Sequence, residues 1–360
     1  MGGRTGRRSA ALAALALAAA GCLDSPPSGI SSDAEAGSWH RKARLTFKNA
    51  MRRPLAEFPV LVHLDDTLRS ALRLSDDLRD LRFLDGDGET HLPFEVTPNL
   101  NQDGTTAIWV KVPRVDQTDE DFIWILGDNP DAAAPGASVA TTVWTGYGGV
   151  WHLEEDDTVF ADATGRGNAG QATDATGRVS GIVGMGQRLS GQRIDISPSF
   201  VAALENFSVE IWVRLEAIDT VDQFAMSGDL VELLADRLDG VGCAVQVHGS
   251  DNTWSDSNAG PTLIADQWSP LAATFRRMGT VGSTTIHFGG QIEGTVETGF
   301  TSLWPPAEAI HVGDGVTGIV DELRITTTPH DEFWLWAETE NAFGDEASNP
   351  FIEYGDAVDI

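Results

Sequence analysis

The stretch that decides the fold begins with Val150-Trp-His-Leu-Glu-Glu-Asp-Asp157 and continues as Phe160-Ala-Asp-Ala-Thr-Gly-Arg-Gly-Asn-Ala-Gly170 and Gly181-Ile-Val-Gly-Met-Gly-Gln-Arg-Leu-Ser-Gly191. Short apolar pieces alternate here with loops dense in Gly, Asp and Asn. Such loops turn tightly, because Gly allows positive φ and Asp or Asn hydrogen-bonds its own backbone. Many short strands joined by tight turns are typical of an all-β sandwich.

Period-two alternation extends this prediction in both directions along the chain. In the second half, apolar Val209, Ile211, Val213 and Leu215 alternate with Glu210, Trp212 and Arg214. In the first half, every second residue is apolar in three further runs: Ala43, Leu45 and Phe47; Phe58, Val60, Val62 and Leu64; and Ile108, Val110 and Val112. Such runs are strands with one apolar face. We therefore predict two β-sandwich domains, residues 39–140 and 143–343, divided near Asp128–Gly136. Short helices are expected within Leu68–Leu81 and Phe333–Asn341. An acidic C-terminal tail, 344–360, follows, and it either packs across the domains or hangs free.

The first 22 residues have the pattern of an export signal. A basic start precedes Ala10–Ala20, built only of Ala and Leu and too short to span a bilayer. The segment ends Ala19-Ala20-Gly21-Cys22, which resembles the lipobox of bacterial lipoproteins, where the cysteine is lipidated. The resemblance implies a lipid anchor at Cys22 in the outer membrane or at the cell surface, with the periplasm also possible; an ordinary secretory signal is the alternative. Residues 23–38 are predicted to be a disordered tether.

The composition restricts the function. The chain has 24 Lys and Arg against 54 Asp and Glu, a net charge of −30. Such a surface repels phosphate backbones, so nucleic acid is not expected as a partner. It favours solubility and cation binding. Only two cysteines occur, which excludes a disulfide scaffold, and Cys243 is predicted to be a buried, inert thiol.

The first half resembles a domain of unknown function that often precedes LamG-like domains in bacterial surface proteins. The resemblance rests on Trp39-His-Arg41, Phe58-Pro-Val-Leu-Val62 and Ile108-Trp-Val-Lys-Val-Pro113, with further motifs in the same order. It implies a β-sandwich and almost nothing about function.

The second half resembles the LamG-like, concanavalin A-like jelly rolls. The matching motifs include Val150-Trp-His-Leu153, Asp162-Ala-Thr-Gly-Arg-Gly-Asn168, Phe207-Ser-Val-Glu-Ile-Trp-Val-Arg214 and the closing strand Ile319-Val-Asp-Glu-Leu-Arg-Ile325. The resemblance implies two packed antiparallel sheets. It also suggests a structural calcium, for which we predict Asp162, Asn168 and Asp321 as ligands.

Asp321 carries the calcium hypothesis. On a regular strand it shares a face with Ile319, Leu323 and Ile325, whereas Arg324 points the other way. A carboxylate on an apolar face is costly unless it is paired or bound to a cation. The alternative is that Asp162 and Asn168 form an Asx turn and Asp321 caps a neighbouring backbone.

No catalytic pattern is found. Glycosidases of the concanavalin-like fold carry an alternating set of carboxylates on one strand, and two carboxylates ~5–10 Å apart are needed. Asp195 stands alone, and Glu210 has no carboxylate two residues away. The eight histidines show no zinc spacing. His152 is interpreted as a structural residue beside the core.

Eleven tryptophans are many for this length. Sugars often stack on an exposed aromatic ring with polar neighbours, which draws on the amphipathic character of aromatic side chains. Trp254, within Ser250-Asp-Asn-Thr-Trp-Ser-Asp-Ser-Asn258, is the best candidate for a ligand contact, and Trp304 is the second. For each, a loop tryptophan packed on its own domain is the alternative.

The sequence therefore predicts a lipid-anchored envelope protein with a LamG-like binding module. It is expected to bind a glycan or an envelope or surface protein without catalysis, and to meet the membrane only through its anchor. The alternatives are a polysaccharide-cleaving hydrolase or lyase on the jelly roll, and a structural adhesion or scaffold subunit.

Overall fold

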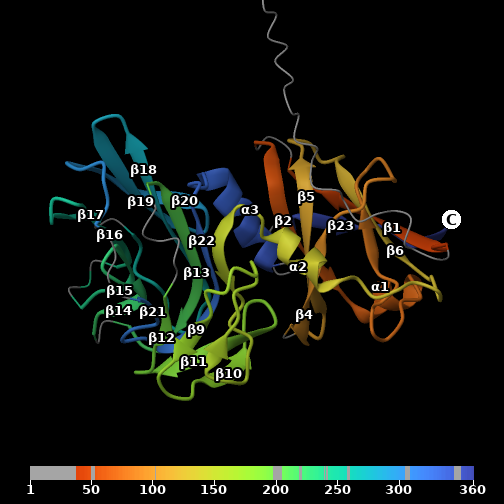
Figure 1. The fold of residues 1–360 in the computed structure, drawn as a ribbon, viewed down its shortest axis with the longest axis horizontal. Helices are drawn as coiled ribbons and strands as arrows, with labels where there is room; N and C mark the ends of the chain where they lie inside the picture. The colour runs from red at the N-terminus through yellow and green to blue at the C-terminus, as the bar shows by residue number, and fades with distance from the viewer. Residues whose placement is uncertain are drawn as a thin grey trace, which may run out of the picture. The chain divides into compact units, whose positions relative to one another are not determined.

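The alternating segments of the sequence become strands of four sheets, which pack as two sandwiches (Figure 1). The computed structural model describes residues 38–49, 53–101, 103–197, 205–218, 221–238, 240, 242–257, 260–304, 309–343 and 350–360. Cys22, the signal segment and nearly all of the predicted tether lie outside these residues. The all-β prediction is confirmed for the described part of the chain.

The first sandwich contains two sheets. One has the order β23-β1-β6-β3, with β24 also paired to β1, and the other has the order β2-β5-β4. The strands are β1 (Arg41–Phe47), β2 (Leu55–Leu64), β3 (Arg82–Leu84), β4 (Phe94–Leu100), β5 (Thr106–Val115), β6 (Phe122–Gly127), β23 (Ile352–Tyr354) and β24 (Val358–Asp359). The apolar alternation predicted for β1, β2 and β5 is confirmed, because those side chains fill one core.

The acidic C-terminal segment 344–360 was predicted either to pack across the domains or to hang free, and the structure describes its last part, residues 350–360, as packed. Its last part forms β23 and β24, which pair antiparallel with β1 and complete the first sheet. Phe351 and Ile352 are buried in the first core. Burying these two apolar side chains stabilises the segment against the sheet despite its acidic composition. The first sandwich is thus built from both ends of the described chain.

The second sandwich has two eight-stranded sheets. The junction sheet has the order β10-β11-β22-β13-β18-β19-β20, with β7 paired to β22; the distal sheet has the order β17-β16-β15-β14-β21-β12-β9-β8. The junction sheet comprises β7 (Tyr147–Trp151), β10 (Gly177–Ser180), β11 (Met185–Ser190), β13 (Phe207–Leu215), β18 (Ser269–Met278), β19 (Val281–Phe288), β20 (Gln291–Thr298) and β22 (Thr317–Thr326). The distal sheet comprises β8 (Val159–Phe160), β9 (Gly170–Ala172), β12 (Ile194–Ile196), β14 (Gln223–Ser227), β15 (Val231–Asp236), β16 (Ala244–His248), β17 (Trp254–Ser257) and β21 (Ile310–Val312).

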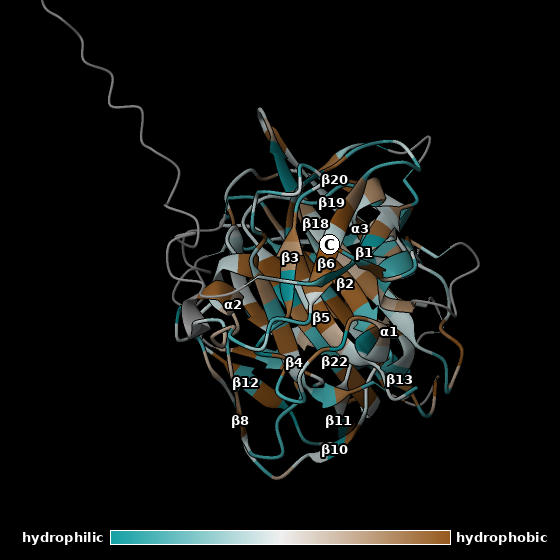
Figure 2. Ribbon diagram, turned by 90° about the vertical axis from the view of Figure 1, so that its right-hand side faces the viewer, coloured by the Kyte–Doolittle hydropathy of each residue, from teal (hydrophilic) through white to brown (hydrophobic). Residues whose placement is uncertain are grey.

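One apolar core fills the space between these two sheets. It includes Val209, Ile211, Val213 and Leu215, as the alternation predicts. In Figure 2, brown apolar segments run along the strands, while many connecting loops are teal. Two packed antiparallel sheets are therefore the architecture of the second half.

A β-bulge in β22 corrects the predicted face of Asp321. The pairing of β13 with β22 shifts between Glu210 and Trp212, and Glu322 has a φ of 49°. The extra residue reverses which face each side chain takes. Leu323 therefore points into the second core, whereas Asp321 and Arg324 both lie on the opposite face of the junction sheet. A bulge of this kind cannot be read from period-two alternation.

Three helices accompany the sheets in the described residues: α1 (Asp66–Ala71), α2 (Ala137–Val143) and α3 (Glu332–Phe343). The helix predicted within Leu68–Leu81 ends early, because Arg73 and Leu78 adopt positive φ. The helix predicted at Phe333–Asn341 is confirmed as α3. None of the described helices combines the length and apolar character that a membrane span requires.

The second face of the β2-β5-β4 sheet is also buried. Leu61 and Trp109 pack with Trp144, Val150 and Val183 in a third apolar cluster. A pair of hydrogen bonds also joins α3 to β2. The Asn341 side chain on α3 accepts a hydrogen bond from Leu61 N at 2.6 Å and donates one to Leu61 O at 2.7 Å. The outer face of the junction sheet is therefore covered, and polar groups on it are buried.

Candidate functional site

The two predicted ligand-contact tryptophans lie in one aromatic stack. His248, at the end of β16, pairs with Trp254, at the start of β17, and their rings stack with centroids 4.4 Å apart and planes 8° apart. Trp304 stacks on His248 as well, at 4.5 Å and 13°. Trp254 is 42% exposed. The stack thus presents a broad, supported aromatic surface on the distal sheet.

Hydrogen bonds fix the histidine between the two indoles. His248 Nδ1 lies 2.9 Å from Asp229 O, and Nε2 lies 3.2 Å from Asn252 Oδ1. The backbone of Trp304 donates to His248 O at 2.9 Å. Both ring nitrogens are engaged, so the imidazole serves as a fixed spacer. A side chain whose rotamer is held in this way presents its neighbour's ring at little entropic cost on binding.

Polar side chains continue the same face of the distal sheet. Trp254 and Asp256 are two residues apart on β17 and so point the same way, as do His248 and Gln246 on β16. Gln246 is paired with both Asp256 and, on β15, Glu232. Its side-chain amide donates to Asp256 Oδ2 at 3.1 Å. The result is a row of acceptors and an amide beside the aromatic stack.

A hollow of about 470 Å³ adjoins this row. Its lining includes Glu232, Gln246, Phe224 and Arg237. Burial, together with the charges of Asp222 and Asp256, raises the pKa of Glu232 above its ordinary value. The hollow therefore combines an aromatic side chain with acidic and basic hydrogen-bonding side chains. This combination suits a small polar ligand.

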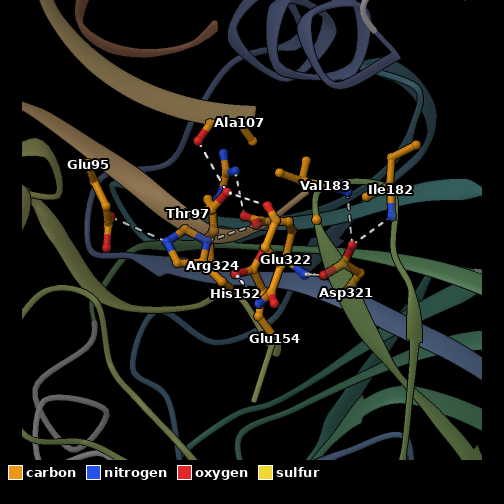
Figure 3. A network of polar contacts seen from close by, with 12 residues as sticks. Glu95, Thr97, Ala107, His152, Glu154, Ile182, Val183, Asp321, Glu322 and Arg324 are labelled. Carbon is orange, nitrogen blue, oxygen red and sulfur yellow. Dashed lines mark hydrogen bonds and ion pairs between the residues drawn. The ribbon is translucent and has the colours of Figure 1, made fainter. Parts of the chain in front are cut away.

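A second polar cluster lies on the buried outer face of the junction sheet (Figure 3). His152 Nδ1 is 2.8 Å from Glu322 Oε1, and His152 Nε2 is 3.4 Å from Glu95 Oε2. Burial opposes the charged imidazole, but the Glu322 and Glu95 carboxylates hold the pKa of His152 well above its ordinary value. The interpretation of His152 as a structural residue agrees with this setting, although its two carboxylate partners were not foreseen.

Arg324 ties this cluster together. Its guanidinium donates to Glu322 Oε2 and to Glu338 Oε1, each at 2.8 Å. It also lies over the Trp109 ring, 4.3 Å from the centroid. Arg324 offsets part of the desolvation cost of the buried carboxylates, as a paired buried charge must. Because Trp109 belongs to β5, this guanidinium links the two sandwiches.

The Gly-rich loop Gly181–Gly184 forms a cradle for Asp321, also visible in Figure 3. Asp321 is fully buried, and its Oδ2 accepts hydrogen bonds from Ile182 N at 2.7 Å and Val183 N at 3.1 Å. A Cβ at Gly181 would overlap this carboxylate. Burial, with the neighbouring Glu322 charge, raises the pKa of Asp321 well above its ordinary value. The loop thus surrounds a side-chain carboxylate instead of a phosphate.

The other two predicted calcium ligands form an Asx turn. Asp162 Oδ1 accepts from Thr164 N at 3.0 Å, and Asp162 Oδ2 accepts from the Asn168 side chain at 2.9 Å. The hydrogen-bond partners of Asp321 do not overlap with those of Asp162. N–H and O–H donors already face these oxygens, so both carboxylates are satisfied by the protein. A calcium ion at Asp162, Asn168 and Asp321 stays a prediction.

Cys243 is fully buried, and burial raises the pKa of its thiol to about 12. The predicted burial of Cys243 is confirmed, and its inertness stays a prediction. Asp195, which stands alone in the sequence, lies 2.7 Å from His311 Nδ1 and 2.9 Å from Arg193 Nε. These two neighbours of Asp195 are therefore an imidazole and a guanidinium, and a second carboxylate is not among them.

Two family models match the chain. One, described as a domain of unknown function (DUF2341), covers residues 77–152; the other, the concanavalin A-like lectin/glucanases superfamily, covers residues 189–331. The chain thus carries these two domains in this order, and the second agrees with the two packed sheets of the second sandwich. A comparison with curated protein sequences finds no match.

Several solved structures are similar at low identity. Domain 4 of AbnA, a GH43 extracellular arabinanase from Geobacillus stearothermophilus in complex with arabinotriose, is 20% identical, with 53% of this chain and 96% of that chain covered and a TM-score of 0.44. The binding domain of botulinum neurotoxin DC in complex with SialylT is 10% identical, with 55% and 52% covered and a TM-score of 0.45. A Trypanosoma rangeli sialidase in complex with 2,3-difluorosialic acid is 11% identical, with 68% and 42% covered and a TM-score of 0.40. These scores lie below 0.5, and the fold assignment rests on the family model and the strand order.

Proposed function

Since the second sandwich contains a concanavalin A-like lectin/glucanase domain, we propose that this protein binds carbohydrate through the outer face of its distal sheet, without cleaving it. The observation that carries the proposal is the stack of Trp254, His248 and Trp304. It holds a 42% exposed indole on the same face as a row of hydrogen-bonding side chains.

The chemistry of a sugar fits both parts of this face. The C–H face of a pyranose is apolar and packs on an indole, while its hydroxyls need donors and acceptors around them. Trp254 offers the first kind of contact. Glu232, Gln246 and Asp256 offer the second, and Arg237 adds a donor at the edge of the hollow.

A glycan array tests this proposal. The purified protein is expected to bind a defined set of glycans, and Trp254→Ala is expected to abolish the signal. Val358→Ala removes a similarly exposed apolar side chain, 47% exposed, from the first sandwich and serves as the control. Retained binding by Trp254→Ala, or equal loss in both variants, contradicts the proposed face.

Binding without cleavage is supported by the environment of the carboxylates on this face. The Asp256 carboxylate is held by the Gln246 amide at 3.1 Å and lies 3.4 Å from Arg237. Both partners already occupy the oxygens of this carboxylate, so it is not free to act on a bound sugar. Burial and the charges of Asp222 and Asp256 raise the pKa of Glu232, so Glu232 is the candidate general acid of the hydrolase alternative. Incubating bound glycans with the protein and measuring new reducing ends tests this: release of reducing ends supports the hydrolase alternative.

The competing proposal is that the protein binds an envelope or surface protein. A structural scaffold role is the third proposal. No glycan signal together with saturable binding of a surface protein, lost in Trp254→Ala, would favour it. The distinction lies in the ligand, because both proposals use the same exposed ring.

We further propose that Cys22 is lipidated and anchors the protein at the outer membrane or cell surface. The short Ala/Leu run that ends in Ala19-Ala20-Gly21-Cys22 supports this. The wild-type protein is expected in the detergent phase of a phase partition and Cys22→Ser in the aqueous phase. Wild-type protein in the aqueous phase contradicts the anchor.

The structural calcium is retained as a proposal for Asp162, Asn168 and Asp321. A cation there must compete with the N–H and O–H donors that face these oxygens. A thermal melt with millimolar calcium tests it: the proposal requires a higher melting temperature that Asp162→Asn loses, and an unchanged melting temperature removes the site.

A further inference from the structure

Three side chains from different elements meet beneath α3. Glu210 lies on β13, His330 follows β22, and Glu338 lies on α3. One ligand atom from each lies within 4.8 Å of the other two. His330 Nδ1 is 2.6 Å from Glu210 Oε1. We propose that Glu210, His330 and Glu338 bind a divalent transition-metal ion, of which zinc is the representative.

A buried oxygen without a donor points to a ligand at this position. Glu210 is only 7% exposed, and its Oε2 is fully buried but receives no hydrogen bond from any of the described residues. One carboxylate oxygen of Glu210 lies within 4.8 Å of one of Glu338. Two carboxylates in such contact need a proton or a cation between them, because both cannot stay ionised at low dielectric. A metal ion supplies the cation.

Space for an ion adjoins these carboxylates. A cavity of about 30 Å³ is lined by Glu210, Glu322, Arg324 and Glu338, among others. This volume holds about one water molecule or one small ion. Glu210 and Glu338 line this cavity, whereas His330 lies beside it without lining it. An ion at the edge of the cavity would take the three side chains as ligands and one water from the cavity, which gives the four ligands of a tetrahedral zinc site.

The local charge favours a divalent ion. Glu210, Glu322 and Glu338 bring three carboxylates, and the Arg324 guanidinium contacts two of them, Glu322 and Glu338. His152 also contacts Glu322, but it is shared with Glu95. The carboxylates around the cavity therefore outnumber the basic side chains that pair with them. Uncompensated negative charge is unfavourable when buried, so it favours a bound cation.

The donor set selects the class of ion. An imidazole nitrogen beside two carboxylates suits zinc and its neighbours in the first transition series, whereas calcium and magnesium prefer oxygen alone. Neighbouring groups hold the ligands in place: the Trp334 ring stacks on His330 at 4.3 Å, Tyr147 Oη donates to Glu338 Oε1 at 3.3 Å, and Arg324 donates to the same oxygen. These contacts hold the Oε1 side of the Glu338 carboxylate in place. Such supporting contacts around the ligands are typical of metal sites.

Metal binding at this position would join α3 to the junction sheet. His330 lies two residues before α3, Glu338 lies in the middle of α3, and Glu210 lies at the centre of the sheet. Binding uses the Nδ1 lone pair of His330, so the neutral imidazole carries its proton on Nε2 when the metal is bound. The site is distinct from the predicted calcium ligands, none of which it shares.

Titration of the purified full-length protein with zinc, after dialysis against a chelator, tests the proposal. One zinc ion is expected to bind per chain and to raise the melting temperature by about 5 °C at a hundredfold excess over Kd. Cobalt is expected to bind in its place and to give a visible absorption band, which reports nitrogen and oxygen ligation directly.

Conservative variants locate the site. His330→Gln and Glu338→Gln are expected to lose the cobalt band and the zinc-dependent rise in melting temperature. His311→Gln is the matched control, because His311 Nδ1 also lies 2.7 Å from a carboxylate, that of Asp195, on the distal sheet. Absence of stoichiometric binding to the wild-type protein would mean that the two glutamates share a proton, and it overturns the proposal. Binding that survives in both variants, or is lost equally in His311→Gln, also overturns it.

Discussion

Replacing Gly184 by alanine tests the contact between the two sandwiches. Gly184 has a φ of 55°, and a Cβ there would overlap Glu154 Oε1. Glu154 is 4% exposed and accepts a hydrogen bond from Asn99 Nδ2, on β4, at 3.2 Å. The Gly184 N–H itself donates to Asn101 Oδ1 at 2.6 Å. The substitution therefore disturbs a buried contact between residues 181–184 and the first sandwich.

The expected loss has two parts. A left-handed φ costs a non-glycine residue about 1–2 kcal/mol. Displacing Glu154 costs about 1–3 kcal/mol more, through overpacking and a weakened hydrogen bond. Gly184→Ala is thus expected to lower the free energy of unfolding by about 2–5 kcal/mol.

Gly279→Ala is the matched control. Its φ of 64° is similar, but a Cβ there meets nothing within 4 Å. It should lose only the backbone part, about 1–2 kcal/mol. Urea denaturation followed by tryptophan fluorescence gives both values. Equal losses in the two variants would refute the packing of Glu154 against Gly184.

Three further predictions concern other buried groups. Asn341→Ala removes both hydrogen bonds to Leu61 and leaves the Leu61 N–H and C=O unpaired. The free energy of unfolding in urea is therefore expected to fall by about 2–4 kcal/mol, and a fall below about 1 kcal/mol would contradict this pairing. Burial lowers the pKa of His287 to about 4. The folded-state pKa lies below the unfolded value of about 6.5, so the stability that neutral His287 contributes is complete above pH 6.5. It is lost towards pH 4, by about 3 kcal/mol. His287→Gln should lose less free energy of unfolding over that pH range, and an identical pH profile would contradict this. Cys243, whose pKa is raised to about 12, should resist alkylation at neutral pH until urea unfolds the chain, and rapid labelling of the native protein would contradict its burial.

The sequence predicts much of the fold, because period-two alternation survives wherever one face of a strand is buried. The strands at 41–47, 55–64, 106–115 and 207–215 follow from it. The prediction from alternation is wrong where a strand contains a bulge, or where a contact joins residues far apart in the sequence. The bulge at Glu322 reverses the face of Asp321, and its positive φ leaves no trace in the pattern. Phe351 and Ile352 were hidden in an acidic segment, although two adjacent apolar residues there were a usable signal.

The candidate site is only partly predictable. Trp254 and Trp304 stand out as tryptophans in polar loops, but their common partner His248 does not. The available signal was its position two residues after Gln246 on a strand with Val245 and Val247, which places both polar side chains on the outer face. The buried cluster around Arg324 could not be predicted, since its members come from both sandwiches and meet only when the sheets pack.

The affinity of the protein for its best array glycan, measured by isothermal titration calorimetry with the wild type and Trp254→Ala, tests the central claim most directly. An exposed tryptophan at the centre of a binding face contributes about 2 kcal/mol or more, so the Kd should rise at least about 30-fold in the variant. Trp254→Phe should recover part of the affinity, since a ring remains to stack on His248. An unchanged Kd in Trp254→Ala would contradict the claim that sugars stack on this face of the distal sheet.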